Sequence, residues 1–266
     1  NLDLDQNAIT NLQGFPDAPG LEQLHLEDNE LANLDGLPPL PGVYHAYLSG
    51  NQLSEIGALA TLCPNLQTLE IARNPIADLS PIAALPQLSE LDVSGTDTSD
   101  FTPLSELAQL RILSVADNGL TDLSWLTQLT GLHYLDLADN SLEDISAISN
   151  LNQLDELDLS GNPLQDLSAI PAGSSLDSLS LNNCGLDDLD TLPASTVLGS
   201  LSLSGNRLTH VPDLARFPNL YDVTLRDNRI AEVTELAGAQ SLSSLDLGRN
   251  QISDISPLAA ISSLQY

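Results

Sequence analysis

The sequence predicts an α/β repeat protein, a solenoid in which similar coils stack side by side and share a parallel β-sheet. Three observations support this fold class. Leucine positions recur about every 22 residues, each period holds an alternating segment followed by leucines three residues apart, and hydrophobic residues make up 42% of the chain but aromatic residues only 3%. The core must therefore be aliphatic, as expected for stacked, similar layers.

The repeats appear when the chain is aligned on itself. A partial repeat containing Leu2, Leu4 and Asn7 comes first, a stub begins at Leu264, and every spacing between full repeats is 22 residues except one of 23. We therefore expect a single domain over residues 1–266, with about 12 repeats, partial at both ends and without terminal caps. The full repeats begin at Leu21, Val43, Leu66, Leu88, Leu110, Leu132, Leu154, Leu176, Leu198, Leu220 and Leu242.

Each repeat predicts a strand followed by a tighter return. A Leu-x-Leu pair turns both side chains to one face of a strand, and leucines three apart bring a tighter coil back over that face. A single repeat buries little, whereas coils stacked about 4.8 Å apart enclose a continuous core in which each Leu contributes ~1.5–3 kcal/mol. In residues 132–151 the inward positions are Leu132, Leu135, Leu137, Asn140, Leu142, Ile145, Ile148 and Leu151.

An asparagine follows most of the predicted strands. Its amide offers donors and an acceptor to backbone groups that the turn leaves unpaired, so we expect it to point inward. Thr96 and Cys184 hold this position in two repeats, where we expect weaker hydrogen bonding. The asparagines are Asn7, Asn29, Asn51, Asn74, Asn118, Asn140, Asn162, Asn206, Asn228 and Asn250.

These features resemble a known family. The pattern is identified as the leucine-rich repeat, and residues 74–85 (NPIADLSPIAAL) and 250–261 (NQISDISPLAAI) resemble the 22-residue repeats of internalin-type bacterial proteins. The phosphatase-regulator branch of this repeat class is similar too. The resemblance covers the whole chain and implies a right-handed solenoid, or horseshoe, with a parallel concave sheet, short 3₁₀ or single-turn helices on the convex side, and a function in protein recognition.

The convex turns carry two further patterns. Ser80–Pro81, Thr102–Pro103 and Ser256–Pro257 predict helical turns that begin with a hydroxyl N-cap. An acidic residue also precedes an inward Leu or Ile in successive repeats, and we expect it to cap backbone amides; adaptation to salt or weak calcium binding are the alternatives. This acidic column is Glu55, Asp78, Asp100, Asp122, Asp144, Asp166 and Asp188.

The charge excludes several function classes. The formal net charge is −30, from 37 acidic and 7 basic residues, and every basic residue is an arginine. A chain this acidic is a poor partner for nucleic acid. Phosphate-loop nucleotide binding and Schiff-base chemistry both need a lysine. No apolar stretch approaches the roughly 20 residues of a membrane span.

Two clusters on the concave strands are candidate partner-binding sites. The first places aromatic rings on adjacent strands, where tyrosine is a preferred interface anchor; a merely solvated face is the alternative. The second is an acidic trough that would attract a basic partner. The first cluster is His25, Tyr44, His45, Tyr47 and Glu70, and the second is Glu90, Asp92, Tyr134, Asp136, Glu156 and Asp158.

A metal site built from His25, His45 and Glu70 is a sharper interpretation of the first cluster, because imidazole and carboxylate suit zinc. These ligands would come from different strands without a local motif, so we assign no metal-binding, cofactor-binding or catalytic residue. An open sheet also does not exclude water from an active site.

The leading hypothesis is a non-enzymatic, exported or surface-displayed bacterial protein that binds a macromolecular partner, a protein with a basic surface, through its acidic concave face. A structural or calcium-responsive spacer or adhesin segment is the first alternative. An intracellular regulatory subunit of phosphatase-regulator type is the second, and it would place the protein in the cytoplasm instead of outside the cell or at its surface.

Overall fold

The structure is a computed structural model that describes the chain except residues 172, 174, 240, 262 and 265–266. The chain forms two compact units. The first unit comprises residues 1–120 and 125–132, and the second comprises residues 121–124 and 133–266. Both are built from the predicted repeat. No helix in the described part of the chain is both long enough and apolar enough to cross a membrane.

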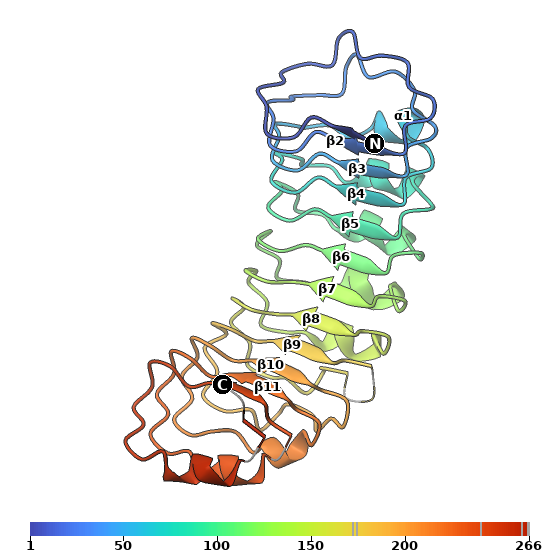
Figure 1. The fold of residues 1–266 in the computed structure, drawn as a ribbon. Coiled ribbons are helices and arrows are strands. Elements are labelled where there is room, and N and C mark those ends of the chain that lie inside the picture. Colours follow the sequence, from blue (N-terminus) through green and yellow to red (C-terminus); the bar gives the residue numbers. More distant parts are fainter. Residues whose placement is uncertain (172, 174, 240, 262, 265–266) are drawn as a thin grey trace. The chain divides into compact units, whose positions relative to one another are not determined.

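Parallel strands form the sheet of the first unit (Figure 1). Neighbouring strands pair in chain order, and each residue pairs with its equivalent one repeat later, as Gln23 does with His45 and His45 with Thr68. This register confirms the alignment predicted from the sequence. The strands are β1 (Leu2–Asp3), β2 (Gln23–His25), β3 (His45–Tyr47), β4 (Thr68–Glu70), β5 (Glu90–Asp92) and β6 (Ile112–Ser114).

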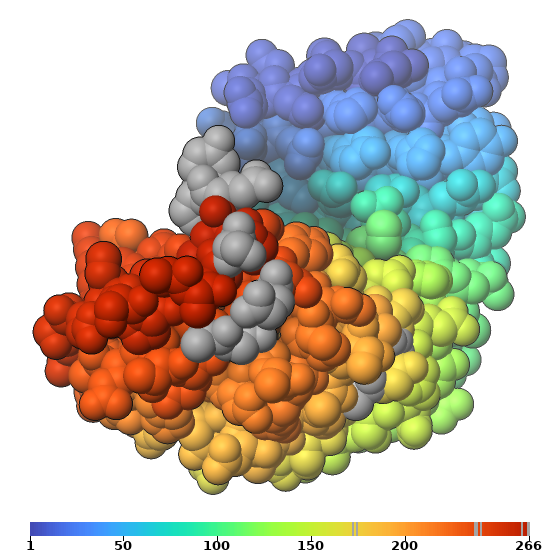
Figure 2. Space-filling model, turned by 60° about the horizontal axis from the view of Figure 1, so that its bottom comes forward, coloured from blue at the N-terminus to red at the C-terminus, as the bar shows by residue number. Residues whose placement is uncertain are grey.

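The second unit has the same architecture. Tyr134 pairs with Glu156 and Ser200 with Asp222, again one repeat apart. Figure 2 shows its successive repeats as adjacent layers, coloured from yellow to red. The strands are β7 (Tyr134–Asp136), β8 (Glu156–Asp158), β9 (Ser178–Ser180), β10 (Ser200–Ser202), β11 (Asp222–Thr224) and β12 (Ser244–Asp246).

Short helices form the return segments, as predicted. The repeat of 23 residues contains the α-helical turn α1 (Leu59–Leu62), in which Leu62 and Cys63 donate backbone hydrogen bonds to residues four positions earlier. The additional residue thus lets an α-turn replace the tighter 3₁₀ turn. The 3₁₀ helices are η1 (Ser80–Ala84), η2 (Thr102–Glu106), η3 (Ser124–Gln128), η4 (Ser146–Asn150), η5 (Leu214–Arg216), η6 (Thr234–Gly238) and η7 (Ser256–Ala260).

The prediction of hydroxyl N-caps was wrong. Ser80 is already the first residue of η1, and no side chain of the preceding Leu79 caps the helix. The carboxylate of Asp78 instead accepts a hydrogen bond from the Ser80 amide at 2.8 Å, because an aspartate reaches the amide two residues on. The same bond links Asp100 to Thr102 and Asp254 to Ser256.

The six aspartates of the acidic column therefore cap backbone amides, as expected, whereas Glu55, the first member of the column, accepts no such bond from the described residues. Asp122, Asp144, Asp166 and Asp188 accept the equivalent bond at 2.8–3.2 Å. Hydrogen bonds from the residue two positions on lower the pKa of Asp144 and of Asp166, which shows that the ionised form is the one these turns favour. The aspartate side chains of this column are thus bonded to the backbone of their own coils.

Leucine side chains fill the interior of each unit. Leu135 and Leu137, the Leu-x-Leu pair at β7, are 0% exposed. Leu24 and Leu26, the equivalent pair at β2, are at most 1% exposed. The middle residue of each three-residue strand thus points inward, and its two neighbours lie on the opposite face, where most are at least partly exposed and Thr68 is buried. This alternation decides which side chains a ligand can reach.

The asparagine ladder joins neighbouring coils. The amide nitrogen of Asn162 donates to the carbonyls of Leu137, Leu159 and Ser160 at 2.9–3.3 Å, and its oxygen accepts from the amide of Leu142 at 3.0 Å. The side chain is 1% exposed. One amide therefore satisfies buried backbone groups of its own coil and of the coil before it.

The two exceptions to the ladder are compensated locally. The thiol of Cys184 donates to the carbonyls of Leu159 and Asn182, but it offers no acceptor to the preceding coil. The Leu164 amide turns instead to the carbonyl of Asn162 at 2.8 Å. The Ile76 amide does the same to Asn74, one coil before Thr96. Fewer bonds cross between coils at these two places, in agreement with the weaker bonding predicted there.

We predict that Asn162→Ala lowers the free energy of unfolding by about 2–5 kcal/mol, because it leaves several buried backbone groups without a hydrogen bond. Urea unfolding followed by circular dichroism measures the change. Asn152→Ala is the matched control, since Asn152 is exposed and bonds only to the nearby Asn150 carbonyl. Equal midpoints for the two variants would contradict this role of the ladder.

Candidate binding surface

The first and last residues of the strands form the solvent-facing side of each sheet, which we call the strand face. Ten of the eleven candidate residues occupy these positions: His25, His45, Tyr47, Glu70, Glu90, Asp92, Tyr134, Asp136, Glu156 and Asp158. The eleventh, Tyr44, precedes β3 and is 37% exposed. The sequence therefore placed all of them on the accessible side of the repeat.

Aromatic stacking organises the first cluster. The rings of His25 and Tyr47 are stacked, with centroids 4.4 Å apart and planes inclined by 17°. These residues end the neighbouring strands β2 and β3, so the parallel register brings the rings face to face. A stacked pair of this kind presents a rigid, amphipathic surface to a partner.

A hydrogen-bonded relay crosses three strands of the first unit. The Thr68 hydroxyl donates to the Glu90 carboxylate at 3.1 Å, and the Nδ1 atom of His45 lies 3.0 Å from the same hydroxyl. Because the Thr68 hydroxyl donates its single hydrogen to Glu90, it can only accept a hydrogen bond from His45. Nδ1 of His45 is therefore the donor to Thr68. The relay orients His45 and connects it to the first acidic residue of the second cluster.

Glu70 lies in a strongly negative environment. Burial, followed by the charges of Glu27, Asp92 and Glu90, raises the pKa of its carboxyl from 4.5 to about 7. Burial is also the main cause that raises the pKa of the Tyr47 hydroxyl, and the negative charge of Glu70 is the second. Unlike the aspartates of the acidic column, Glu70 accepts no side-chain hydrogen bond from the described residues that would stabilise its charge.

The structure does not bring His25, His45 and Glu70 together as a metal site. Of the described side chains, only Asp5, His25 and Glu27 place three metal-ligating atoms within 4.8 Å of one another. Asp5 and Glu27 are not among the residues predicted from the sequence, because each lies two residues beyond the last residue of its strand. Their occupation of equivalent positions in consecutive repeats was the pattern that could have identified them.

The second cluster is divided between the two units. Glu90 and Asp92 belong to β5 of the first unit, and the other four residues belong to β7 and β8 of the second. Within the second unit, Tyr134 pairs with Glu156 and Asp136 with Asp158. The carboxylates of Asp136 and Asp158 accept hydrogen bonds from the Ala138 and Ser160 amides at 2.9 and 2.8 Å, which orients both acids.

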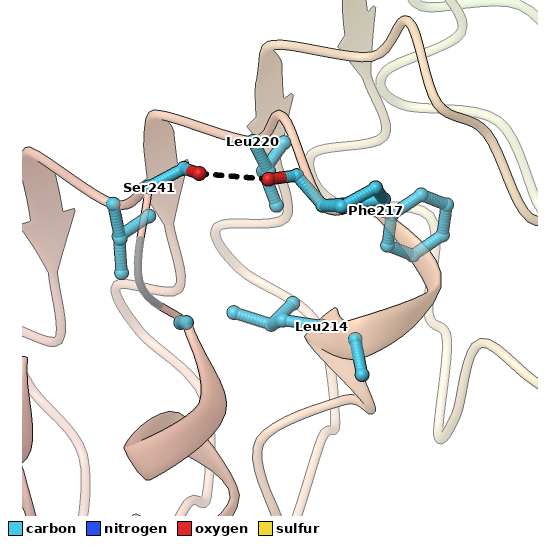
Figure 3. Close-up of a pocket in the computed structure, with 8 residues that line it drawn as sticks. Leu214, Phe217, Leu220 and Ser241 are labelled. Carbon is cyan, nitrogen blue, oxygen red and sulfur yellow. Dashed lines mark hydrogen bonds between the residues drawn. The ribbon is translucent and has the colours of Figure 1, made fainter.

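An apolar pocket of about 250 Å³ lies in the second unit, away from the candidate residues (Figure 3). The Ser241 hydroxyl donates to the Pro218 carbonyl across it at 2.7 Å. The pocket is lined by Leu214, Ala215, Phe217, Pro218, Leu220, Ala239, Ser241 and Leu242. No titratable side chain is among these residues, so the pocket carries no acid–base chemistry.

Sequence models of the leucine-rich repeat match three parts of the chain. A leucine-rich-repeat model covers residues 108–164, a two-copy model covers residues 45–83 and 64–106, and a third covers residues 238–255. No curated protein matches the sequence. With the stacked parallel strands and 3₁₀ turns, these models confirm the predicted class of fold, the leucine-rich repeat.

Solved structures show which family of leucine-rich-repeat proteins this chain resembles. The internalin InlF of Listeria monocytogenes superposes with a TM-score of 0.81 at 26% identity, over 98% of this chain and 84% of the internalin. Internalin C2 of the same bacterium gives 0.63 at 31% identity, over 67% and 79%. A chain of the mouse RP105/MD-1 complex gives 0.72 at 23%, over 91% and 44%, and shares the fold alone. The chain belongs to the internalin-like family of bacterial leucine-rich-repeat proteins.

We predict that Glu70→Gln stabilises the protein at pH 8 but not at pH 4.5. Because folding raises the pKa of Glu70, its contribution to stability is complete below pH 4.5 and is lost as the pH rises towards 7. Solvent screening reduces the gain to about 1 kcal/mol, a rise of about 2–4 °C in melting temperature. Thermal melts from pH 4 to 8 test this. Glu106→Gln, which removes the same charge from an exposed turn, should show no such trend.

Proposed function

We propose that this protein is a non-enzymatic, exported or surface-displayed bacterial module that binds a protein partner with a basic surface through its strand face. Leucine-rich-repeat proteins are generally binding modules of this kind, and the similarity to internalins supports the proposal. The observation that carries it is the concentration of stacked aromatic rings and oriented carboxylates on neighbouring strands of the first unit.

The first cluster supplies the anchors. Tyr44 and Tyr47 offer large contact areas at a low cost in side-chain entropy, and Tyr47 is already held by its stacking on His25. The Tyr44 ring is among the more exposed large hydrophobic groups of the described chain. Burial of these rings against a partner would provide most of the affinity.

The carboxylates supply attraction and selectivity. The net charge of −30 steers a basic partner towards the protein at long range, and the acids of the strand face set its orientation on contact. Around Glu70, where burial already raises the pKa of the carboxyl, the negative charges of Glu27, Asp92 and Glu90 lie close enough to raise it further. An arginine or lysine seated there would relieve the repulsion among them and would lower the pKa of Glu70.

The convex acids support a spacer function less well. A calcium-responsive spacer would need carboxylates directed towards ions, whereas each aspartate of the acidic column from Asp78 to Asp188 accepts a hydrogen bond from its own backbone. The strand face therefore remains the better candidate for function. An extracellular or surface location follows from the internalin-like family as part of the same proposal.

We predict that Tyr47→Ala and Asp136→Arg each weaken partner binding by about tenfold or more, without a change in circular dichroism. A photo-reactive residue at position 44 would first identify the partner in a target-cell extract by cross-linking, and a residue at position 146, on a convex turn, would serve as the control label. Calorimetry with the purified partner then gives the affinities.

Asp144→Arg is the matched control for Asp136→Arg, because it makes the same charge change on the acidic column instead of the strand face. Unchanged affinity in both strand-face variants, or an equal loss in the Asp144 variant, would contradict the proposal.

A further inference from the structure

Asp5, His25 and Glu27 converge at the first two coils of the first unit. One ligand atom from each lies within 4.8 Å of the other two, and Nδ1 of His25 is 3.8 Å from Oδ2 of Asp5. Ligands about 2.1 Å from a tetrahedral ion lie about 3.4 Å from each other, so small side-chain rotations would close this group around one ion.

His25 differs from the other histidines in its hydrogen bonding. The Nδ1 atoms of His45, His133 and His210 lie within hydrogen-bonding distance of Thr68, Asp155 and Thr209, respectively. In the described part of the chain His25 has no such partner: 3.8 Å exceeds a hydrogen bond, and its Nε2 atom is buried without one. A buried Nε2 atom without a partner is costly, and Nδ1 stays available to a ligand because no hydrogen bond to Asp5 uses it.

The cluster is held in position from two sides. Oδ1 of Asp5 accepts a hydrogen bond from the Glu27 amide at 2.7 Å, which leaves Oδ2 directed towards His25. Tyr47 stacks on the imidazole from the next coil. The ring and the first carboxylate are therefore positioned before any ligand arrives, as in sites that bind metals well.

Charge at the cluster also favours a cation. Asp5 and Glu27 place two carboxylate oxygens within 4.8 Å of each other, and Asp28 follows Glu27 directly in the chain. The guanidinium of Arg73 lies 3.3 Å from the Asp28 carboxylate in an ion pair. A dication would relieve the remaining repulsion between the carboxylates.

We propose that Asp5, His25 and Glu27 form a binding site for a divalent transition-metal ion, with Zn²⁺ as the expected ligand. One imidazole and two carboxylates are donors that suit zinc, whereas calcium takes oxygen ligands and gains nothing from the imidazole. Because Tyr47 stacks on His25, a bound ion would also stiffen the aromatic cluster of the strand face.

The test is calorimetric titration of the chelator-treated protein with ZnCl₂, repeated with Co²⁺ to record the absorption bands of the bound ion. We expect one equivalent of Zn²⁺ per chain and a higher melting temperature with Zn²⁺. Glu27→Gln should weaken binding by about tenfold or more and His25→Ala by about a hundredfold, with loss of the cobalt spectrum.

Two matched variants control for other binding. His133→Ala removes an exposed histidine that faces the single carboxylate of Asp155, and Glu30→Gln removes an exposed charge three residues from Glu27. Both should bind Zn²⁺ like the wild-type protein. The isosteric Glu27→Gln variant keeps the test valid if His25→Ala misfolds.

The proposal is overturned if the wild-type protein takes up no Zn²⁺ at millimolar concentration, or if Glu27→Gln and His25→Ala bind it unchanged. It is also overturned if equimolar Ca²⁺ displaces the Zn²⁺, because the site would then be a carboxylate cluster without a contribution from the imidazole.

Discussion

The hydrogen bonding between the backbones of adjacent coils is the constraint on which the rest of the structure depends. A coil of 22 residues has too little surface to bury its own leucines, and its turn leaves backbone groups unpaired. Strand pairing satisfies part of this need, and the asparagine ladder satisfies the part that the strands do not reach. The leucine core follows, since coils held in this register place equivalent side chains against one another.

The same register imposes a cost at the surface, because charges at equivalent positions of adjacent coils lie next to like charges and repel them. Most of these carboxylates accept a hydrogen bond from an amide of their own coil. On the convex turns, an amide two residues on donates to each aspartate, as Ser80 does to Asp78, and this bond lowers the pKa of Asp78. On the strand face, Asp92, Asp136 and Asp158 accept the same kind of bond. The amide two residues after Glu70, that of Ala72, donates instead to the Ser49 hydroxyl, and burial raises the pKa of Glu70. Glu70 therefore differs from these strand-face aspartates and would gain from an external partner.

This difference gives the binding proposal its physical basis. A structural charge is neutralised within its coil, whereas a charge kept in an unfavourable environment gains when a ligand arrives. The first unit concentrates such groups: Glu70 among acids, His25 without a hydrogen bond, and Tyr47 stacked above it. A basic protein surface and a metal ion would use neighbouring parts of this one area, and the shared residue pair His25–Tyr47 couples them.

The sequence by itself determined the repeat, its register, the inward leucines and asparagines, and the outward position of every candidate residue, because each of these follows from spacing along the chain. It also anticipated the weak ladder positions at Thr96 and Cys184, but not that the Ile76 and Leu164 amides turn to carbonyls of their own coils.

The partners of side chains were decided only by the tertiary structure. Spacing did not reveal that Asp78 instead of Ser80 caps its turn, or that His25 joins Asp5 and Glu27 instead of His45 and Glu70. Periodicity specifies the face on which a residue lies. Rotamers, burial and the neighbouring coil, which exist only once the coils have stacked, specify what it touches.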